Sequence, residues 1–184
     1  MAILKQLAHS YPSEIDLINC IYYILNPVKT HPSLINTNNV ICLNPLVAPD
    51  IVSSQMIAVQ KGQSLKSTRR MYHFVFSPDY EFEPSDPHTL YSIGIAFQML
   101  YPKYQSLFAI HANTKHIHLH LIYNNIPVWG NKQLSKILNI STMENLADLI
   151  LIDMSNRKMQ NRAAGISPIS IAKAALQILY HGYC

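Results

Sequence analysis

Four of the nine histidines in this chain fall within ten residues, in the segment IHANTKHIHLHLIYNN. Side chains on a β-strand alternate between its two faces, so His116, His118 and His120 would share one face while the apolar residues between them face the core. A tight turn would bring His111, near the end of the preceding strand, back beside them. Imidazole is the commonest protein ligand for divalent transition metals. Three of these rings could therefore form one side of a coordination shell that leaves positions for water or substrate.

The spacing of the histidines predicts a site without identifying its reaction. A single histidine on a strand is usually an ordinary core or surface residue. A face of several imidazoles, however, would stabilise a sheet poorly, because each buried ring needs a hydrogen-bond partner. The run HIHLHLI also matches the pattern of the histidine-triad nucleotide hydrolases, in which a histidine is the nucleophile. A metal centre and a nucleophilic histidine both remain open on this evidence.

A pair of tyrosines in CIYYILNPVKT supplies a second candidate nucleophile. A helix over residues 13–25 would place Leu17, Ile21 and Ile24 on one apolar stripe. Tyr23 falls nearly opposite that stripe and would face away from the core. An outward tyrosine is usually a surface residue. Beside a metal-held phosphate, however, its hydroxyl could act as a nucleophile, because the metal would polarise the phosphate and help to carry the charge of the phenolate.

The elements that must position these groups follow from periodicity and from helix and strand boundaries. Ser13 reads as a helix N-cap with Asp16 three residues on, and Pro27 ends that helix because a proline disfavours helical geometry in the preceding residue. The order of elements predicts an α/β fold of the α+β two-layer sandwich type, with helices flanking a central sheet of about five strands. Strands are expected at 3–8, 38–45, 71–78, 105–112 and 116–125, and helices at 13–25, 48–62, 86–102, 142–157 and 167–182.

The composition is that of a folded domain, and we expect no membrane-spanning segment. The 184 residues suffice for one domain, with a catalytic core expected at 1–130 and a helical extension of the same domain at 131–184. Hydrophobic residues make up 49% and charged residues 13%, which excludes a disordered chain. There is no long apolar run and no signal-like N-terminus, and three scattered cysteines favour a reducing cytoplasm. The net charge of +4 suits a polyanionic partner without requiring one.

Four segments, taken in order, resemble motifs of the relaxase, or mobilisation nuclease, family of plasmids and integrative elements. They are YILNPVKT, ICLNP, MYHFVFS and HANTKHIHLHLIYN. In the branch common in Gram-positive gut bacteria, the corresponding motifs are Y-x-x-N-P-x-K-T, an N-C-x-P-like strand, Y-H-F-x-x-S-F and H-x-D-x-x-H-x-H-x-H-x-x-x-N. The likeness runs from about residue 15 to residue 125. It implies the fold of the histidine-hydrophobe-histidine endonucleases, a mainly antiparallel sheet with two histidine-bearing strands in its middle.

The resemblance implies a site- and strand-specific DNA nickase and transesterase that acts in conjugative mobilisation. Carried over by position, Tyr23 would attack the scissile phosphate at a transfer origin and form a 5′-phosphotyrosyl link. His111, His118 and His120 would hold a divalent metal ion, magnesium or manganese, and His116 would have a supporting role. The implied partners are single-stranded DNA at the origin, an accessory DNA-binding mobilisation protein and a type IV secretion coupling protein.

Five further residues are candidates for contacts with DNA. Ser77 and Asn124 match a serine and an asparagine of the family motifs, and the serine is associated with positioning DNA near the nick. Lys29, Arg69 and Arg70 are our candidates for backbone phosphate contacts, because such contacts hold nucleic acid without reading its sequence.

The chain departs from the family motifs at three positions, where it has Val28, Pro78 and Asn113 in place of glutamate, phenylalanine and aspartate. If that aspartate orients a metal ligand, Asn113 would supply a weaker supporting contact. Two alternatives to an active relaxase stay open: a histidine-triad-type nucleotide hydrolase, and a degenerate, non-catalytic module that still binds an origin.

Overall fold

The computed structural model describes residues 3–63, 67–78, 87–113, 116–159 and 167–181. Its elements follow the predicted order, with two short 3-10 helices added. They are β1 Ile3–Gln6, α1 Glu14–Ile24, η1 Pro32–Leu34, β2 Ile35–Asn38, α2 Pro49–Gly62, β3 Met71–Ser77, α3 Pro87–Leu100, β4 Tyr104–His111, β5 His118–Pro127, η3 Leu134–Lys136, α4 Ile140–Met159 and α5 Pro168–His181.

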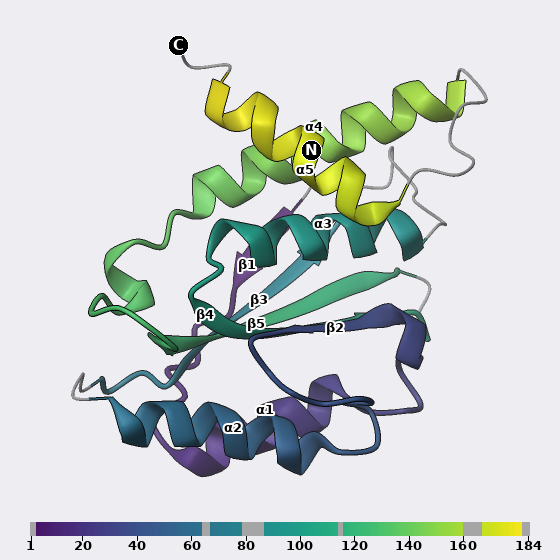
Figure 1. Cartoon of the computed structure of the whole chain (residues 1–184). Coiled ribbons are helices and arrows are strands. Elements are labelled where there is room, and N and C mark those ends of the chain that lie inside the picture. The colour runs from purple at the N-terminus through teal and green to yellow at the C-terminus, as the bar shows by residue number, and fades with distance from the viewer. Residues whose placement is uncertain (1–2, 64–66, 79–86, 114–115, 160–166, 182–184) are drawn as a thin grey trace.

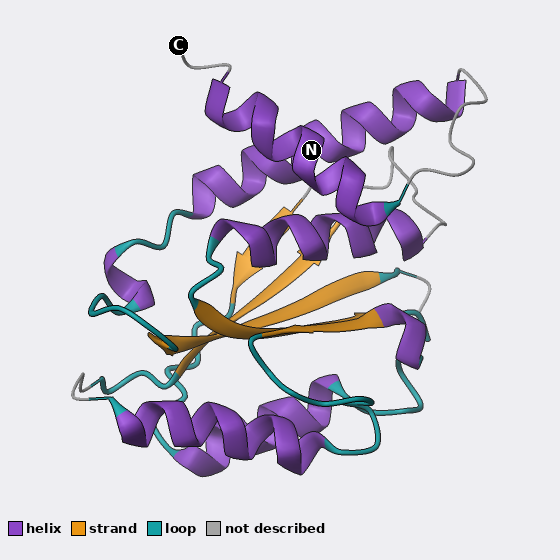
Figure 2. Cartoon of the chain, viewed as in Figure 1, coloured by secondary structure: helices purple, strands orange, loops and turns teal. Residues whose placement is uncertain are grey.

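The strands form one antiparallel sheet of five strands in the order β1-β3-β5-β4-β2. Helices α1 and α2 lie on one face of this sheet, and α3, α4 and α5 lie on the other (Figure 1; Figure 2). The predicted α/β class, with a central antiparallel sheet and flanking helices, is confirmed. The two histidine-bearing strands, β4 and β5, are paired at the centre, with His111 opposite His118.

Alternation along β5 divides the hydrophobic core into two clusters. Leu119 and Leu121 pack with α3, α4 and α5, whereas Ile122 packs with α1 and α2 on the other face. His118 and His120 share the face of Ile122, because residues two apart on a strand point the same way. The histidines therefore lie on the α1/α2 side of the sheet.

Helix α1 begins and ends as its sequence predicts. Ser13 and Asp16 form a capping box, in which the Ser13 hydroxyl accepts a hydrogen bond from the Asp16 N–H and the Asp16 carboxylate accepts one from the Ser13 N–H. Leu17, Ile21 and Ile24 are fully buried. The helix buries this stripe against the sheet and leaves its opposite side accessible.

The predicted strand at 38–45 is wrong. The edge strand β2 is the polar segment Ile35–Asn38, and the apolar run that follows is a connection in which Ile41 is 88% exposed. Asn39 turns the chain with a φ of 56°. The Gln55 side chain then satisfies the backbone of Ile41, accepting from its N–H at 2.9 Å and donating to its carbonyl at 2.8 Å. Local hydrophobicity was a poor guide because this segment has no strand to pair with.

The two C-terminal helices complete the second face. Residues of α4 and α5, such as Leu146 and Ala172, belong to the same buried cluster as Phe97 of α3 and Phe108 of β4. Among the described residues, no helix is both long enough and apolar enough to cross a membrane.

Candidate metal centre and its tyrosine

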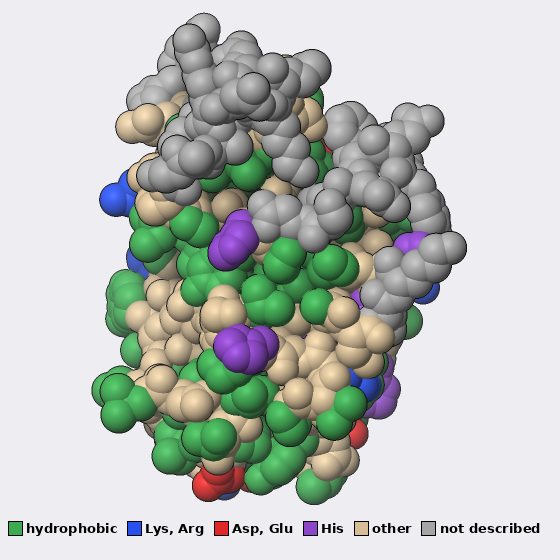
Figure 3. Space-filling model, turned by 90° about the vertical axis from the view of Figure 1, so that its right-hand side faces the viewer, with side chains coloured by type: hydrophobic (Ala, Val, Ile, Leu, Met, Phe, Trp, Pro, Cys, Tyr) green, Lys and Arg blue, Asp and Glu red, His purple; other side chains and the backbone are tan. Residues whose placement is uncertain are grey.

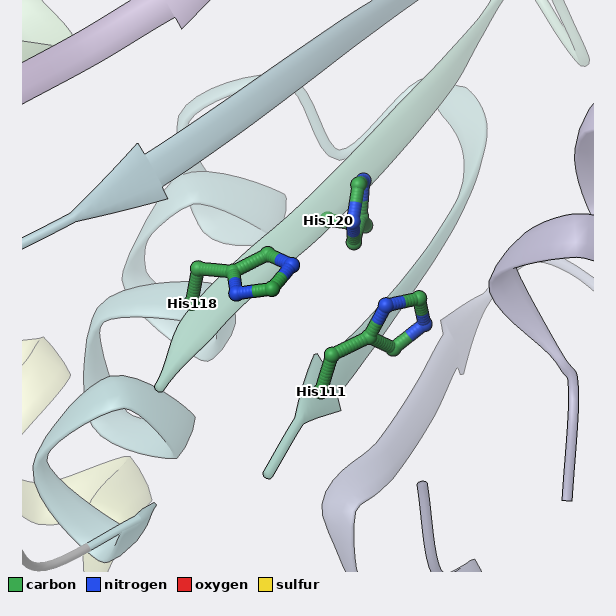
Figure 4. A group of neighbouring side chains, drawn as sticks. All are labelled: His111, His118 and His120. Atoms are coloured by element: carbon green, nitrogen blue, oxygen red, sulfur yellow. The ribbon is translucent and has the colours of Figure 1, made fainter. Parts of the chain in front are cut away.

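The β4–β5 hairpin gathers three histidines into one cluster. His111 ends β4, and His118 and His120 open β5, so the antiparallel register places all three rings side by side. One nitrogen from each ring lies within 4.8 Å of the others. Figure 4 shows the rings around a common space. The predicted grouping of His111 across the turn with the His118–His120 pair is what the structure shows.

Two of the three rings use one nitrogen in a hydrogen bond to a backbone carbonyl. Nε2 of His111 donates to the carbonyl of Ile24 at 2.9 Å, so Nδ1 carries the lone pair of the neutral ring. Nδ1 of His118 donates to the carbonyl of His116 at 3.0 Å, so Nε2 would carry the lone pair of the neutral form of that ring. These assignments follow because a carbonyl can only accept.

The third ring points most clearly to a metal ligand. Nδ1 of His120 lies 2.9 Å from Nε2 of His73, whereas Nε2 of His120 is buried and has no hydrogen-bond partner among the described residues. A buried polar atom without a partner is costly, so such an atom calls for a ligand or an ion. The three rings therefore fit a divalent metal ion.

Burial keeps the cluster in the form that binds metal. Burial, with the neighbouring histidines adding to it, lowers the pKa of His120 to about 2. Burial also lowers the pKa of His111, against the opposing effect of its hydrogen bond to Ile24. Both rings are thus neutral at physiological pH, and a neutral imidazole has the lone pair that a metal requires.

Tyr23 lies against this cluster. Its ring packs edge-on to His111 and His120, with centroid separations of 5.8 and 5.5 Å. Tyr23 is 48% exposed, so it is partly accessible from solvent. The amine of Lys29 lies 3.7 Å from the centre of the same ring, in a cation–π contact.

Two hydrogen bonds tie the end of α1 to the end of β4. Ile24, next to Tyr23, accepts from His111, and the carbonyl of Lys29 accepts from the N–H of Ala112 at 3.0 Å. The tyrosine and the first histidine are therefore positioned by the same pair of contacts, although they are far apart in the sequence.

Three of the other predicted residues lie at this end of the sheet. Ser77 ends β3, one residue beyond Phe76, which pairs with Leu119, and it shares a face with His73 and Val75. His116 precedes β5, is exposed, and supports His118 through its backbone carbonyl. Asn113 is exposed just after β4, and residues 114–115 of the predicted connection lie outside the described residues.

Arg69 and Arg70 lie at the opposite end of β3. Met71 pairs with Asn124, whereas Val75 pairs with His120, which puts about 13 Å of strand between the two ends. The Arg70 guanidinium donates to the Gln60 side chain at 2.7 Å. Any phosphate bound by these arginines would lie well away from the tyrosine.

Asn124 has a structural position, and the expected DNA contact at this residue is corrected. Its side chain is fully buried. The amide donates to the carbonyl of Met56 and to the Gln105 side chain, both at 3.0 Å, while its oxygen accepts from Gln60 at 2.9 Å. With no exposed surface, Asn124 joins β5 to α2 and β4 and offers nothing to DNA.

His73 is the residue of the site that sequence reasoning missed. It is buried on β3, on the same face as His120, and contacts it directly. Burial lowers the pKa of His73 to about 4. The signal was present in MYHFVFS, because a histidine among strand residues that otherwise bury apolar groups needs a polar partner.

A known family model matches most of the chain. The family model described as "Relaxase: MobA/VirD2-like, nuclease domain" matches residues 23–155, which spans Tyr23, the histidine cluster and most of α4. No curated protein matches the chain.

Proposed function

The chain belongs to the relaxase family of MobA/VirD2-like nuclease domains, and on this premise we propose that it is a metal-dependent DNA nickase with Tyr23 as its nucleophile. Family membership shows a DNA-cleaving nuclease of the relaxase type. The contact of the Tyr23 ring with His111 and His120 is the observation that supports the finer assignment. No other tyrosine in the described residues has a ring contact with both of these histidines.

The proposed reaction is a transesterification at phosphorus. The Tyr23 oxygen attacks the scissile phosphate, the bond from phosphorus to the 3′-oxygen breaks, and a 5′-phosphotyrosyl link forms. The phenol gives up its proton to solvent, and the departing 3′-oxygen takes one up as a hydroxyl. Because one phosphodiester replaces another, the link retains the energy needed to rejoin the strand when the 3′-hydroxyl attacks in reverse. This chemistry fits strand transfer from a transfer origin in conjugative mobilisation.

His111, His118 and His120 would hold the divalent metal ion. When bound, the ion polarises the phosphate and offsets the negative charge that develops on it. A ligand set of three imidazoles suits manganese better than magnesium, because magnesium favours oxygen ligands. We therefore propose manganese as the preferred ion, with magnesium as the weaker alternative.

We propose that uncharged groups take part in holding the substrate strand. Figure 3 faces the end of the sheet where β4 and β5 are joined, and among the described residues visible on it hydrophobic and uncharged side chains outnumber Lys and Arg. Lys29 is the cation placed at the tyrosine, so we propose that it contacts the phosphate next to the scissile bond. Ser77, on the histidine face of β3, is the proposed hydrogen-bonding partner of the same strand.

We propose that residues 131–184 extend the same domain instead of forming a second one. The support is the shared core, in which Leu146 and Ile150 of α4 pack in one cluster with Phe97 of α3. An accessory mobilisation protein and a type IV coupling protein remain proposed partners, in keeping with the family.

A covalent adduct is the test of this function. The protein is mixed with Mn²⁺ and a library of labelled single-stranded oligonucleotides that carry the transfer origins of mobile elements, and adducts are resolved under denaturing conditions. We expect an adduct with the parent protein and with Tyr22→Phe, and none with Tyr23→Phe. Tyr22 is the matched control because it is equally exposed on the same helix.

The outcomes separate the alternatives. An adduct that persists in Tyr23→Phe overturns the assigned nucleophile. Metal-dependent binding of an oligonucleotide without an adduct would identify a non-catalytic origin-binding module. Metal-independent hydrolysis of a nucleoside phosphoramidate that survives Tyr23→Phe and is lost in His118→Ala would identify a histidine-triad hydrolase.

A further inference from the structure

His73 is a buried histidine that the proposed chemistry does not use. It lies on β3 directly opposite Ile122, so it is the diagonal neighbour of His120 on the face that carries the metal cluster. The two rings are 5.1 Å apart between centroids, and the nitrogen separation of 2.9 Å marks a hydrogen bond. His73 is only 2% exposed, so this bond is shielded from water.

The direction of that bond decides which nitrogen of His120 faces the cluster with a lone pair. If Nδ1 of His120 donates to Nε2 of His73, Nε2 of His120 is unprotonated and can bind a metal. The reverse direction would put the hydrogen of His120 on Nε2, which has no hydrogen-bond partner in the part of the chain that is described. A buried N–H without an acceptor is costly, so the first direction is favoured.

The other side of His73 is arranged to support this direction. With Nε2 accepting, the hydrogen of His73 is on Nδ1, which lies 2.8 Å from the Tyr11 hydroxyl oxygen and 3.4 Å from the Cys20 sulfur. Both atoms can accept a hydrogen bond. His73 is therefore held between a ligand histidine and two buried groups from the N-terminal part of the chain.

In many metal sites a carboxylate accepts the hydrogen bond from a ligand histidine and so fixes its tautomer and ring orientation. Here no Asp or Glu joins the three histidines within the described residues. The position that would carry such a group in the family hairpin is the exposed Asn113. The imidazole of His73, on the neighbouring strand, is the group that can accept a hydrogen bond from His120.

We propose that His73 is a positioning residue that accepts a hydrogen bond from His120 and thereby presents the His120 Nε2 lone pair to the metal. This inference rests on the metal site of the proposed function but not on the nicking reaction. It makes the affinity for the ion depend on a residue outside the ligand set. It also links Tyr11 and Cys20 to the site through a continuous chain of contacts.

The test measures Mn²⁺ binding by isothermal titration calorimetry, without DNA. We expect His73→Leu to weaken binding by roughly 10- to 100-fold, the usual loss when such a supporting partner is removed. We expect His73→Gln to bind within about threefold of the parent, because the Gln carbonyl oxygen can replace Nε2 as acceptor. The matched control is Val75→Ala, which removes a side chain from the same face of β3 beside His120 but no hydrogen bond.

A second readout, the tautomer of His120, is independent of metal. Nitrogen-15 correlation spectra of the metal-free protein should show His120 with its hydrogen on Nδ1, and that signal should shift to the other tautomer or to a mixture in His73→Leu. Parent-like Mn²⁺ affinity in His73→Leu, or a His120 hydrogen on Nε2 in the parent, would overturn the proposal. If the parent binds no Mn²⁺, the metal site of the proposed function fails, whereas the role of His73 is still decided by the tautomer.

Discussion

Acidification should destabilise the metal-free protein through its buried histidines, mainly through His73 and His120, with His111 adding in the same direction because burial also lowers its pKa. Burial holds the pKa of His73 at about 4 and that of His120 at about 2, against about 6.5 for an unperturbed imidazole. Between these values the unfolded chain binds protons that the folded chain does not. The free energy of unfolding is therefore not reduced by these histidines above pH 6.5, and it falls as the pH drops below that value.

The size of the effect follows from the same values. Between pH 7 and pH 5 each of the two histidines costs the folded state about 2 kcal/mol, since one pKa unit corresponds to about 1.4 kcal/mol. A total of about 4 kcal/mol is a large share of the typical 5–15 kcal/mol of a domain. Asp16 does not contribute in this range, because its hydrogen bonds with Ser13 lower the pKa of its carboxyl from an already lower value.

Urea unfolding in the presence of a chelator, followed by circular dichroism at pH 7 and pH 5, measures this loss. His120→Gln should reduce the difference between the two pH values by about 2 kcal/mol, because this group no longer titrates. Val75→Ala, which changes the residue paired with His120 but removes no titratable group, serves as the control and should retain the difference. Equal stability of the parent at both pH values, or an unchanged difference in His120→Gln, would refute the reasoning.

Three further predictions concern Lys29, Asn124 and Gly94. Lys29→Met removes the charge beside Tyr23 but keeps an apolar side chain, so the cleavage rate at low salt should fall about tenfold. The difference in rate from the parent should shrink at higher salt, because salt screens the Lys29 charge in the parent. The Mn²⁺ affinity measured by calorimetry should stay the same. Asn124→Ala leaves several buried groups without partners, and should lower the free energy of unfolding in urea by about 2–4 kcal/mol while the adduct yield of the folded fraction is kept. Gly94→Ala places a Cβ on α3 2.8 Å from the Phe108 ring, and should lower the free energy of unfolding in urea by about 1–3 kcal/mol. A variant as stable as the parent would contradict this close packing of α3 on β4.

Much of the fold could be predicted from the sequence because local capping and alternation patterns agree with the tertiary structure. The capping box of Ser13 and Asp16 defined the start of α1, and alternation in HIHLH defined which residues of β5 share a face. The order of elements then predicted the sheet class. The exception was β2, where INTN forms the strand because β4 is available to pair with it, which no local property of that segment reveals.

The sequence predicted which histidines lie together and which tyrosine lies beside them, but not the residue that contacts them from β3. The three histidines and Tyr23 carry the family motifs, and the structure brings all four together. The hydrogen bond between His120 and His73 joins two strands 47 residues apart, so its existence depends on register. Asn124 is a motif position for which the sequence suggests a role in function, but its side chain donates to the carbonyl of Met56 and so holds α2 against the sheet.

The site is also dispersed along the chain in a way that matters during synthesis. Tyr23 is made early, on α1, whereas the histidines lie on β4 and β5, the last two strands of the sheet to leave the ribosome. A nascent or truncated chain that carries the tyrosine but lacks β5 has no cluster to activate a phosphate. Under the proposed function, cutting activity would begin only once the central hairpin has docked onto α1 and brought the histidine cluster to Tyr23.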